Sequence, residues 1–267
     1  MEIQFPRYLS WKVILDQDNP SSKFGKQTSG RITRSIPILK KAGYEFVFEE
    51  VDDAYLDKFV PLYEEFISSK ERGTIFPIRE RVAGWRKDGE KVNALSLYKQ
   101  TKFIGGLIFS IEKKTNLLSV NYKVLPHSIE EKMPISVSFV AEFYLRTYAL
   151  EHGFLAIGHG TDRNIYGYHS NIGLVAFKLQ IGCQPFIPTT RVSTGEPNQI
   201  LTTIPIFDED MFIFLGHTHE VNITQAALIS PKPEEELKKK FPILFSNTCF
   251  ETKIISPSDV SSTSDWK

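Results

Sequence analysis

Residues 154–185, FLAIGHGTDRNIYGYHSNIGLVAFKLQIGCQP, hold the pattern from which the fold is inferred. The short apolar run Phe154–Gly158 predicts a buried strand, and a polar stretch follows it. We expect Ser170 to cap a short helix that Gly182 ends, because hydroxyl caps and terminal glycines mark helix boundaries. The apolar positions of this helix recur at helical spacing: Leu174, Phe177 and Ile181. The stretch therefore predicts a strand, a polar loop and a helix.

The polar loop His159–Tyr168 is the first place to look for chemistry, because sheet proteins often place functional side chains where a strand ends. His159 is a candidate general base, since an ordinary histidine has a pKa of about 6.5. Asp162 could orient that histidine or act itself, and Arg163 could bind a carboxylate or phosphate. The loop also supplies two candidate substrate-binding residues: Asn164 and Tyr166. A polar surface loop held by its own turns is the alternative.

Upstream of this stretch, hydrophobic spacing predicts a strand over Tyr44–Val51 and then a helix, capped by Asp52 or Asp53, that reaches about Lys70. Three further strands are expected, joined by short connectors: Asn93–Lys99, Phe103–Glu112 and Leu117–Leu125. Pro134 is expected to open a long helix that Gly153 ends. Downstream, strand-like runs and one polar helix are expected: Gln184–Val192, Gln199–Phe207, Asp210–Leu215 and Phe241–Ile255, with the helix over Pro233–Lys240.

The order of these elements defines the expected fold class. Strands and helices neither alternate strictly nor separate into an all-β chain. We therefore predict an α/β fold (an α+β mixed sheet), in which a mixed, mostly antiparallel central sheet is flanked by helices.

Length and composition exclude several classes of protein. A chain of 267 residues can bury roughly 70–75% of its unfolded surface without cross-links. Its two cysteines, Cys183 and Cys249, are too few for a disulfide framework. The longest apolar run is far shorter than the ~18 residues that a membrane span needs, and the first residues lack the apolar core of a signal peptide. We expect no membrane span and a cytoplasmic location.

Charge is balanced overall but uneven along the chain. Lys plus Arg and Asp plus Glu number 32 each, which argues against a protein whose whole surface traps anionic polymers. Residues 1–42 nevertheless carry a net charge of +5. This segment is either a solvated lead-in or a contact for nucleic acid. Within it, residues 17–30 are polar and predict a mobile loop.

Two motif hypotheses are weak. The run Gly158–Arg163 begins like a dinucleotide-binding loop, but it lacks a third glycine and an immediate helix. His217 and His219 could chelate a metal from one face of a strand, but no third ligand lies nearby in the sequence. We therefore expect no metal.

An ordered set of residues resembles the last strand, loop and helix of the Fem-type aminoacyltransferases, the FemAB-like branch of the GNAT (N-acetyltransferase) fold superfamily. The set is Gly158, Gly173-Leu174, Phe177-Lys178 and Gly182. The basic run Gly30–Lys41, which precedes a strand, is similar to the helical lead-in of that branch. The expected element order matches a GNAT core from about residue 44 to residue 207, about 60% of the chain.

This resemblance implies the transfer of an acyl or aminoacyl group from an activated donor to an amine. It implies that Lys178 supplies a cation for phosphate or developing charge at the donor site, with Phe177 as a packing wall. Asn121 and Tyr122 lie on the strand that faces the acyl donor in GNAT proteins. His127 and Glu142 are weaker candidates. The predicted site thus has catalytic His159, Asp162 and Lys178, and donor- or substrate-binding Asn121, Tyr122, Arg163, Asn164, Tyr166 and Phe177.

The donor is either an acyl thioester or an aminoacyl-tRNA. Acyl-CoA-binding GNAT proteins hold the pyrophosphate on a glycine-rich turn, whereas this chain has Pro126–Pro134 without glycine at that place. Acyl-CoA is therefore a possible but doubtful cofactor. Expected partners are a small-molecule or peptide amine acceptor and a tRNA or carrier-protein donor, and the sequence does not predict an oligomeric state. A GNAT-shaped binding or scaffold protein without turnover is the alternative.

The resemblance also suggests a division of the chain. We expect a basic lead-in over residues 1–42 and a GNAT-like acyltransferase domain over residues 43–215. A C-terminal extension over residues 216–255 and a disordered tail over residues 256–267 would follow.

Overall fold

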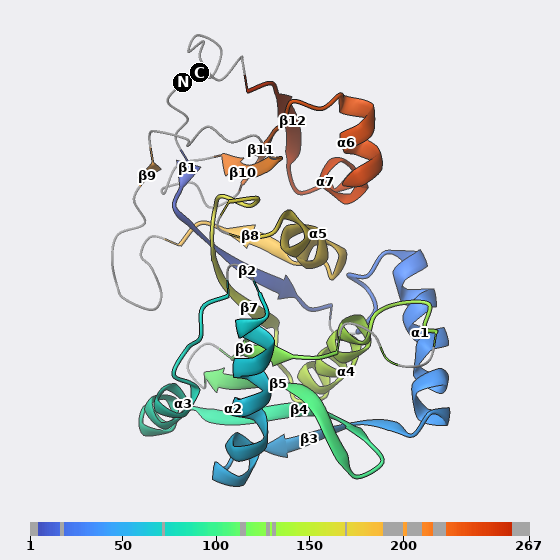
Figure 1. The fold of residues 1–267 in the computed structure, drawn as a ribbon, viewed down its shortest axis with the longest axis vertical. Coiled ribbons are helices and arrows are strands. Elements are labelled where there is room, and N and C mark those ends of the chain that lie inside the picture. Colours follow the sequence, from blue (N-terminus) through green and yellow to red (C-terminus); the bar gives the residue numbers. More distant parts are fainter. Residues whose placement is uncertain are drawn as a thin grey trace. The chain divides into compact units, whose positions relative to one another are not determined.

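The computed structural model describes residues 5–16, 19–70, 73–112, 116–126, 129, 132–168, 170–188, 200–201, 210–215 and 223–257. Seven strands hydrogen-bond in the order β3-β4-β5-β6-β7-β2-β8, and helices flank this mixed sheet (Figure 1). The predicted mixed α/β fold is confirmed. The chain divides into two compact units, residues 13–160 and residues 1–12 with 161–267. The predicted domain boundaries near residues 42 and 215 stay predictions.

The unit of residues 13–160 is built on five neighbouring strands. They are β3 (Tyr44–Glu50), β4 (Lys91–Lys99), β5 (Lys102–Glu112), β6 (Leu117–Val124) and the first part of β7 (Ala156–Arg163). The first four pair antiparallel, an arrangement that was predicted for β4, β5 and β6. β7 pairs with β6 in parallel, and this ladder joins Leu117–Ser119 to Ala156–Gly158. The pairing among these five strands is therefore mostly antiparallel, and it is parallel between β6 and β7, where the predicted site begins.

Helices cover both faces of these strands. They are α1 (Lys26–Lys41), α2 (Asp53–Ser68), α3 (Ile78–Lys87) and α4 (Val137–Glu151). Side chains of α1 and α4, such as Leu39 and Leu145, share a buried cluster with Leu107 of β5. Side chains of α2 and α3, such as Phe59, share another with Ile108, the next residue of β5. Successive strand residues point to opposite faces, so one strand anchors both helical layers.

The unit of residues 1–12 and 161–267 contains most of β2 (Tyr8–Ile14), paired antiparallel with β8 (Gln184–Phe186). Two smaller sheets accompany it, formed by β1 (Phe5–Pro6) with β9 (Ile200–Leu201), and by β10 (Met211–Leu215), β11 (Gln225–Ile229) and β12 (Glu251–Ile255). Its helices are α5 (Ile172–Gln180), α6 (Glu234–Lys240) and α7 (Pro242–Ser246). A buried cluster that includes Phe5, Ile213 and Ala227 ties β1 to β10 and β11.

Several local predictions were wrong. Asn171, rather than Ser170, caps α5, because its side-chain oxygen accepts the N–H of Gly173 at 2.7 Å. The predicted loop 17–30 gives way to α1 at Lys26. The expected strand Phe241–Ile255 contains the helix α7 before β12.

Other boundaries moved. α4 begins at Val137 after the cap residue Ser136, rather than at Pro134. The loop expected from His159 is a strand as far as Arg163, because β7 continues past its pairing with β6. β8 ends at Phe186, well short of Val192. Most of the expected strand Gln199–Phe207 lies outside the described residues.

A buried carboxylate holds β10 to the segment that follows β11. Asp210 accepts hydrogen bonds from Ser230 Oγ at 2.6 Å, Lys240 Nζ at 2.9 Å and Lys232 Nζ at 3.0 Å. Burial by itself raises the pKa of Asp210, but these three donors outweigh it and lower the pKa to about 2. The carboxylate is therefore stabilised in its charged form in the folded protein.

We expect the Asp210→Asn variant to be less stable by about 2 kcal/mol at pH 7, because the folded pKa lies below the ordinary value. A lowered pKa contributes stability above the unfolded value, and this contribution is lost as pH falls from about 5 toward 2. Urea unfolding of both proteins at pH 7, 5 and 3 measures the difference. A difference that stays constant from pH 7 to pH 3 would contradict the expectation.

Candidate functional site

The centre of the candidate site is an ion pair between the two parts of the motif around residues 154–185. Asp162 lies near the end of β7, and Lys178 lies in the last turn of α5. Lys178 Nζ is 2.7 Å from Asp162 Oδ2, and the two side chains are only 7% and 15% exposed. The fold thus brings together two residues that are 16 positions apart and were predicted separately.

Two aromatic side chains complete the arrangement. Tyr166 donates its hydroxyl hydrogen to Asp162 Oδ2 at 3.1 Å, and Trp11 of β2 donates Nε1–H to the Tyr166 hydroxyl at 3.0 Å. Lys178 Nζ lies 5.3 Å from the centre of the Trp11 ring, within reach of a cation–π interaction. We refer to Trp11, Asp162, Tyr166 and Lys178 as the Asp162 network.

The electrostatics of the network favour the protonated form of Tyr166. Burial raises the pKa of Tyr166 well above its ordinary value, and the negative charge of Asp162 raises it further. The phenol therefore remains a hydrogen-bond donor over the physiological range. A buried ion pair is a costly way to stabilise a fold, since an apolar pair of similar volume is often as good. Buried, partnered ionisable groups of this kind are candidates for function.

A second polar cluster lies in the unit of residues 13–160. His159 Nε2 is 3.4 Å from Glu142 Oε2 of α4, and their side chains are 6% and 0% exposed. One helical turn further along α4, the buried Arg146 places its guanidinium carbon 3.8 Å from the centre of the Phe24 ring. A histidine beside a buried carboxylate is a pair of side chains that can act as an oriented general base.

Asn164 is used inside the fold. Its side-chain amide donates to the carbonyl oxygens of Pro6 and Phe214 at 2.9 and 2.8 Å, and its side-chain oxygen accepts from Phe214 N–H at 2.9 Å. The residue is fully buried. Through these contacts Asn164 joins β1 to β10.

The remaining predicted residues are Arg163, Phe177, Asn121 and Tyr122. Arg163 is exposed, and Phe177 is half-buried on α5. Asn121 is the extra residue of a β-bulge in β6 and donates its amide to Ser110 Oγ at 3.1 Å. The neighbouring Tyr122 is buried against Tyr63, and burial raises its pKa.

Sequence reasoning missed Trp11 altogether and gave Glu142 little weight. The signal for Trp11 was the alternating run Tyr8–Ile14, which predicts a strand with one buried face. Glu142 stands among apolar neighbours on α4, and a charged residue in such a stretch is a signal in its own right. His127 lies outside the described residues.

The described part of the chain holds no group of three or more side chains suited to a metal ion. His217 and His219 lie outside it. The described helices include none that is both long and apolar enough to cross a bilayer. For an anionic cofactor, Lys178 and Arg163 are the cations that the motif provides.

No protein-family model matches the chain, and neither does any curated protein. Solved structures do match. L-PGS from Bacillus licheniformis is 18% identical over 66% of this chain and 52% of its own, with a TM-score of 0.43. FemX is 14% identical over 76% and 63%, with a TM-score of 0.49. A tandem GNAT protein from the clavulanic acid biosynthesis pathway is 13% identical over 75% and 53%, with a TM-score of 0.42.

The chain therefore spans between about half and less than two thirds of the length of these structures. A protein named FemX and a GNAT protein are among the structures to which the chain is similar, as the sequence resemblance predicted.

Proposed function

We propose that this protein transfers an acyl or aminoacyl group from an activated donor to an amine. The observation that carries the proposal is the Asp162 network. Asp162, Tyr166 and Lys178 were each predicted as site residues from the sequence, and all three meet in one buried set of contacts. The resemblance of the same stretch to Fem-type aminoacyltransferases supplies the reaction class.

The reaction has simple chemical requirements. The amine nitrogen attacks the donor carbonyl carbon, a C–N bond forms, and the C–S bond of a thioester or the C–O bond of an aminoacyl ester breaks. The amine loses a proton, and the leaving thiolate or alkoxide gains one. Negative charge develops on the carbonyl oxygen and then on the leaving group, so fixed donors and cations nearby lower the barrier.

Lys178 is the group proposed to meet that charge. Its ammonium carries three hydrogens, one of which is directed at Asp162. Asp162 and the Trp11 ring hold the ammonium in place, so that little reorganisation is needed during the reaction. Tyr166 acts as a positioning residue, because its contact is with Asp162.

His159 is the group proposed to accept the proton of the amine, with Glu142 orienting it. Arg163, Asn121, Tyr122 and Phe177 are proposed to contact the donor or the acceptor, as the resemblance implies. The donor is proposed to be an acyl thioester or an aminoacyl-tRNA, and the acceptor a small-molecule or peptide amine. A cytoplasmic setting stays a prediction.

One observation favours a second candidate, a binding or scaffold protein without turnover. Asp162 Oδ2 accepts from both Lys178 and Tyr166, and Trp11 satisfies the Tyr166 hydroxyl. A polar cluster with a purely structural role also requires that its members satisfy one another's hydrogen bonds, as they do here.

The two candidates differ in a donor screen. The protein is incubated with acetyl-CoA, longer acyl-CoAs and a mixed aminoacyl-tRNA pool, together with panels of amines and peptides, and release of free thiol or deacylated tRNA is followed. We expect donor-dependent release that requires an amine. A parallel thermal unfolding series detects binding, since a ligand at 100 times its Kd adds about 2.7 kcal/mol of stability. Stabilisation by a donor without any release would instead favour the binding protein.

A further inference from the structure

The exposed side of α1 carries an unbroken run of positive charge. From Asn19 to Tyr44 the sequence has six basic residues and no acidic residue, although the whole chain is neutral. The six are Lys23, Lys26, Arg31, Arg34, Lys40 and Lys41, and all of them are exposed. None forms an ion pair with an acid among the residues that the structure describes. Their field is therefore not neutralised locally.

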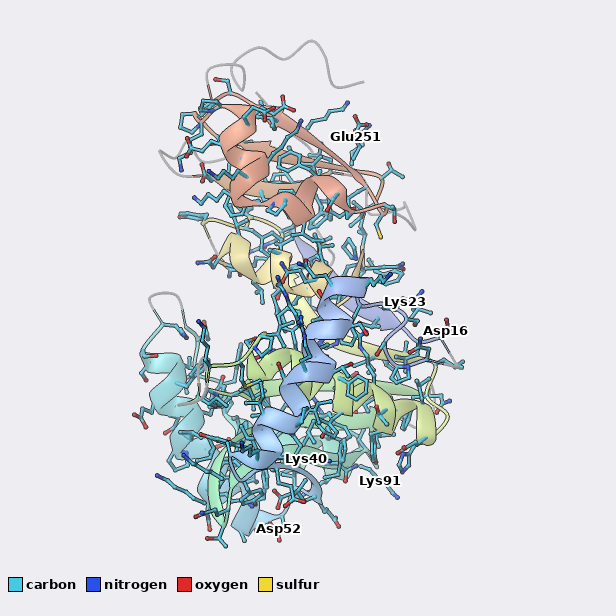
Figure 2. All side chains as sticks on the ribbon, turned by 90° about the vertical axis from the view of Figure 1, so that its right-hand side faces the viewer. Asp16, Lys23, Lys40, Asp52, Lys91 and Glu251 are labelled. Carbon is cyan, nitrogen blue, oxygen red and sulfur yellow. The ribbon has the colours of Figure 1, made fainter. Side chains whose placement is uncertain are left out.

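Helical geometry gathers these charges on one side. With 3.6 residues per turn, the five cations within α1 fall within about half of the helix circumference, along a face about 22 Å long. The opposite side holds the buried residues Ile32, Ser35 and Leu39. In Figure 2, α1 crosses the front of its unit, with Lys23 near its start and Lys40 near its end. We call this side the α1 basic face.

Gly30 lies near the middle of the α1 basic face. A glycine inside a helix costs stability relative to alanine, because it has more backbone freedom to lose. No neighbouring group in the described structure requires glycine at this position, since no atom lies within 4 Å of where a Cβ would stand. A glycine at such a place leaves the backbone open to close approach by another molecule.

We propose that the α1 basic face binds the phosphate backbone of RNA. Cations spaced along a rigid helix match a row of phosphates, and Gly30 allows that row to approach the helix closely. A membrane fits less well, because a membrane-surface helix needs a free apolar face. The apolar side of α1 is buried in the core of its own unit. The link to chemistry rests on the proposed function, in which an RNA contact favours the aminoacyl-tRNA donor.

The test measures binding of the whole protein to a labelled 20-base-pair RNA duplex by fluorescence anisotropy, over a series of salt concentrations. In the α1 variant, four cations of the face become glutamine: Lys26, Arg31, Arg34 and Lys41. We expect its affinity at low salt to fall by at least about 30-fold. The slope of log affinity against log salt should become less steep by about three to four, because each phosphate contact contributes about one.

A matched control makes the same change of charge elsewhere in the same unit. Four exposed lysines with no ion pair to a described acid become glutamine: Lys87, Lys91, Lys102 and Lys132. We expect this control to change affinity by less than about threefold. Equal losses in the two variants would overturn the proposal, because they would show a diffuse charge effect. Weak wild-type binding, with a Kd above about 100 µM at low salt, would also overturn it.

Gly30→Ala tests the close approach separately. Alanine should raise Tm by about 1–4 °C, because it favours the helix, and should weaken RNA binding about threefold or more. Higher Tm with unchanged binding would remove close approach from the proposal. Binding to vesicles with anionic lipid but not to RNA would replace RNA by a membrane surface. No donor or acceptor is present, so failure of acyl transfer leaves this result unaffected.

Discussion

Replacing Lys178 with methionine is expected to lower the rate of acyl transfer by about 10²–10³-fold, the loss that follows removal of one fixed donor to a developing oxyanion. Methionine keeps most of the length of the side chain but carries no hydrogen-bond donor. The effect should appear mainly in kcat, because the charge that Lys178 meets exists in the transition state. Steady-state kinetics with the donor found in the screen measures it.

The same change should also destabilise the fold, by about 3 kcal/mol, because it leaves the buried Asp162 carboxylate without its cation. Unfolding of the variant would also lower the measured rate and would then be mistaken for a loss of catalysis. The double variant Asp162→Asn with Lys178→Met separates the two effects. A neutral amide can still accept the Tyr166 hydroxyl, so we expect stability near that of the wild type with activity still low.

Lys240→Met is the matched control in the same unit, because Lys240 also pairs with a buried aspartate. Its side chain is 50% exposed, and Asp210 keeps Lys232 and Ser230. We expect unchanged kinetics and a stability loss below about 1 kcal/mol. If the double variant of the Asp162 network recovered activity together with stability, the role of Lys178 would be structural rather than catalytic.

The predictable part of the fold was the part with local periodicity. The helix after Asp52 was predicted from its cap residue and from apolar residues at helical spacing. In the structure the cap side chain accepts Tyr55 N–H at 2.7 Å. The strands β4, β5 and β6 are separated by short connectors and pair in sequence order. The alternation of Tyr8–Ile14 is a local signal for the strand β2 but not for its pairing, because its partner β8 lies more than 170 residues further along the chain. Nothing in a local window signals such a pairing.

The candidate site was likewise predictable only as far as local sequence carries the information. The residue types in the stretch after Phe154 indicated where polar chemistry is concentrated, but not which side chains meet. Asp162 of β7 accepts a hydrogen bond from Lys178 of α5, and Trp11, which bonds Tyr166, comes from the strand β2 near the N-terminus. Asn164 is of a residue type that is common in binding sites, yet its amide forms hydrogen bonds with backbone groups of two strands. Spacing in a sequence cannot distinguish these fates.

Replacing His159 with alanine is expected to lower kcat by about 10²–10⁴-fold, the usual contribution of a positioned general base. Added imidazole should restore part of the activity, because it can occupy the space that the ring leaves. Glu142→Gln should cost less. Loss of an orienting carboxylate costs about 10⁴ in the serine protease triad, but the 3.4 Å separation here is long for a hydrogen bond. We expect about 10–10²-fold, with KM nearly unchanged.

His152 provides the matched control, because it is exposed in the same unit and stacks on Tyr148 with ring centres 4.0 Å apart. His152→Ala should leave kcat unchanged and show no response to imidazole. Equal losses in the two histidine variants, or an unchanged kcat in His159→Ala, would remove His159 from the reaction. The amine would then have to lose its proton through another group or through water. The case for Lys178 would stand unaffected, because the Asp162 network is measured by its own variants.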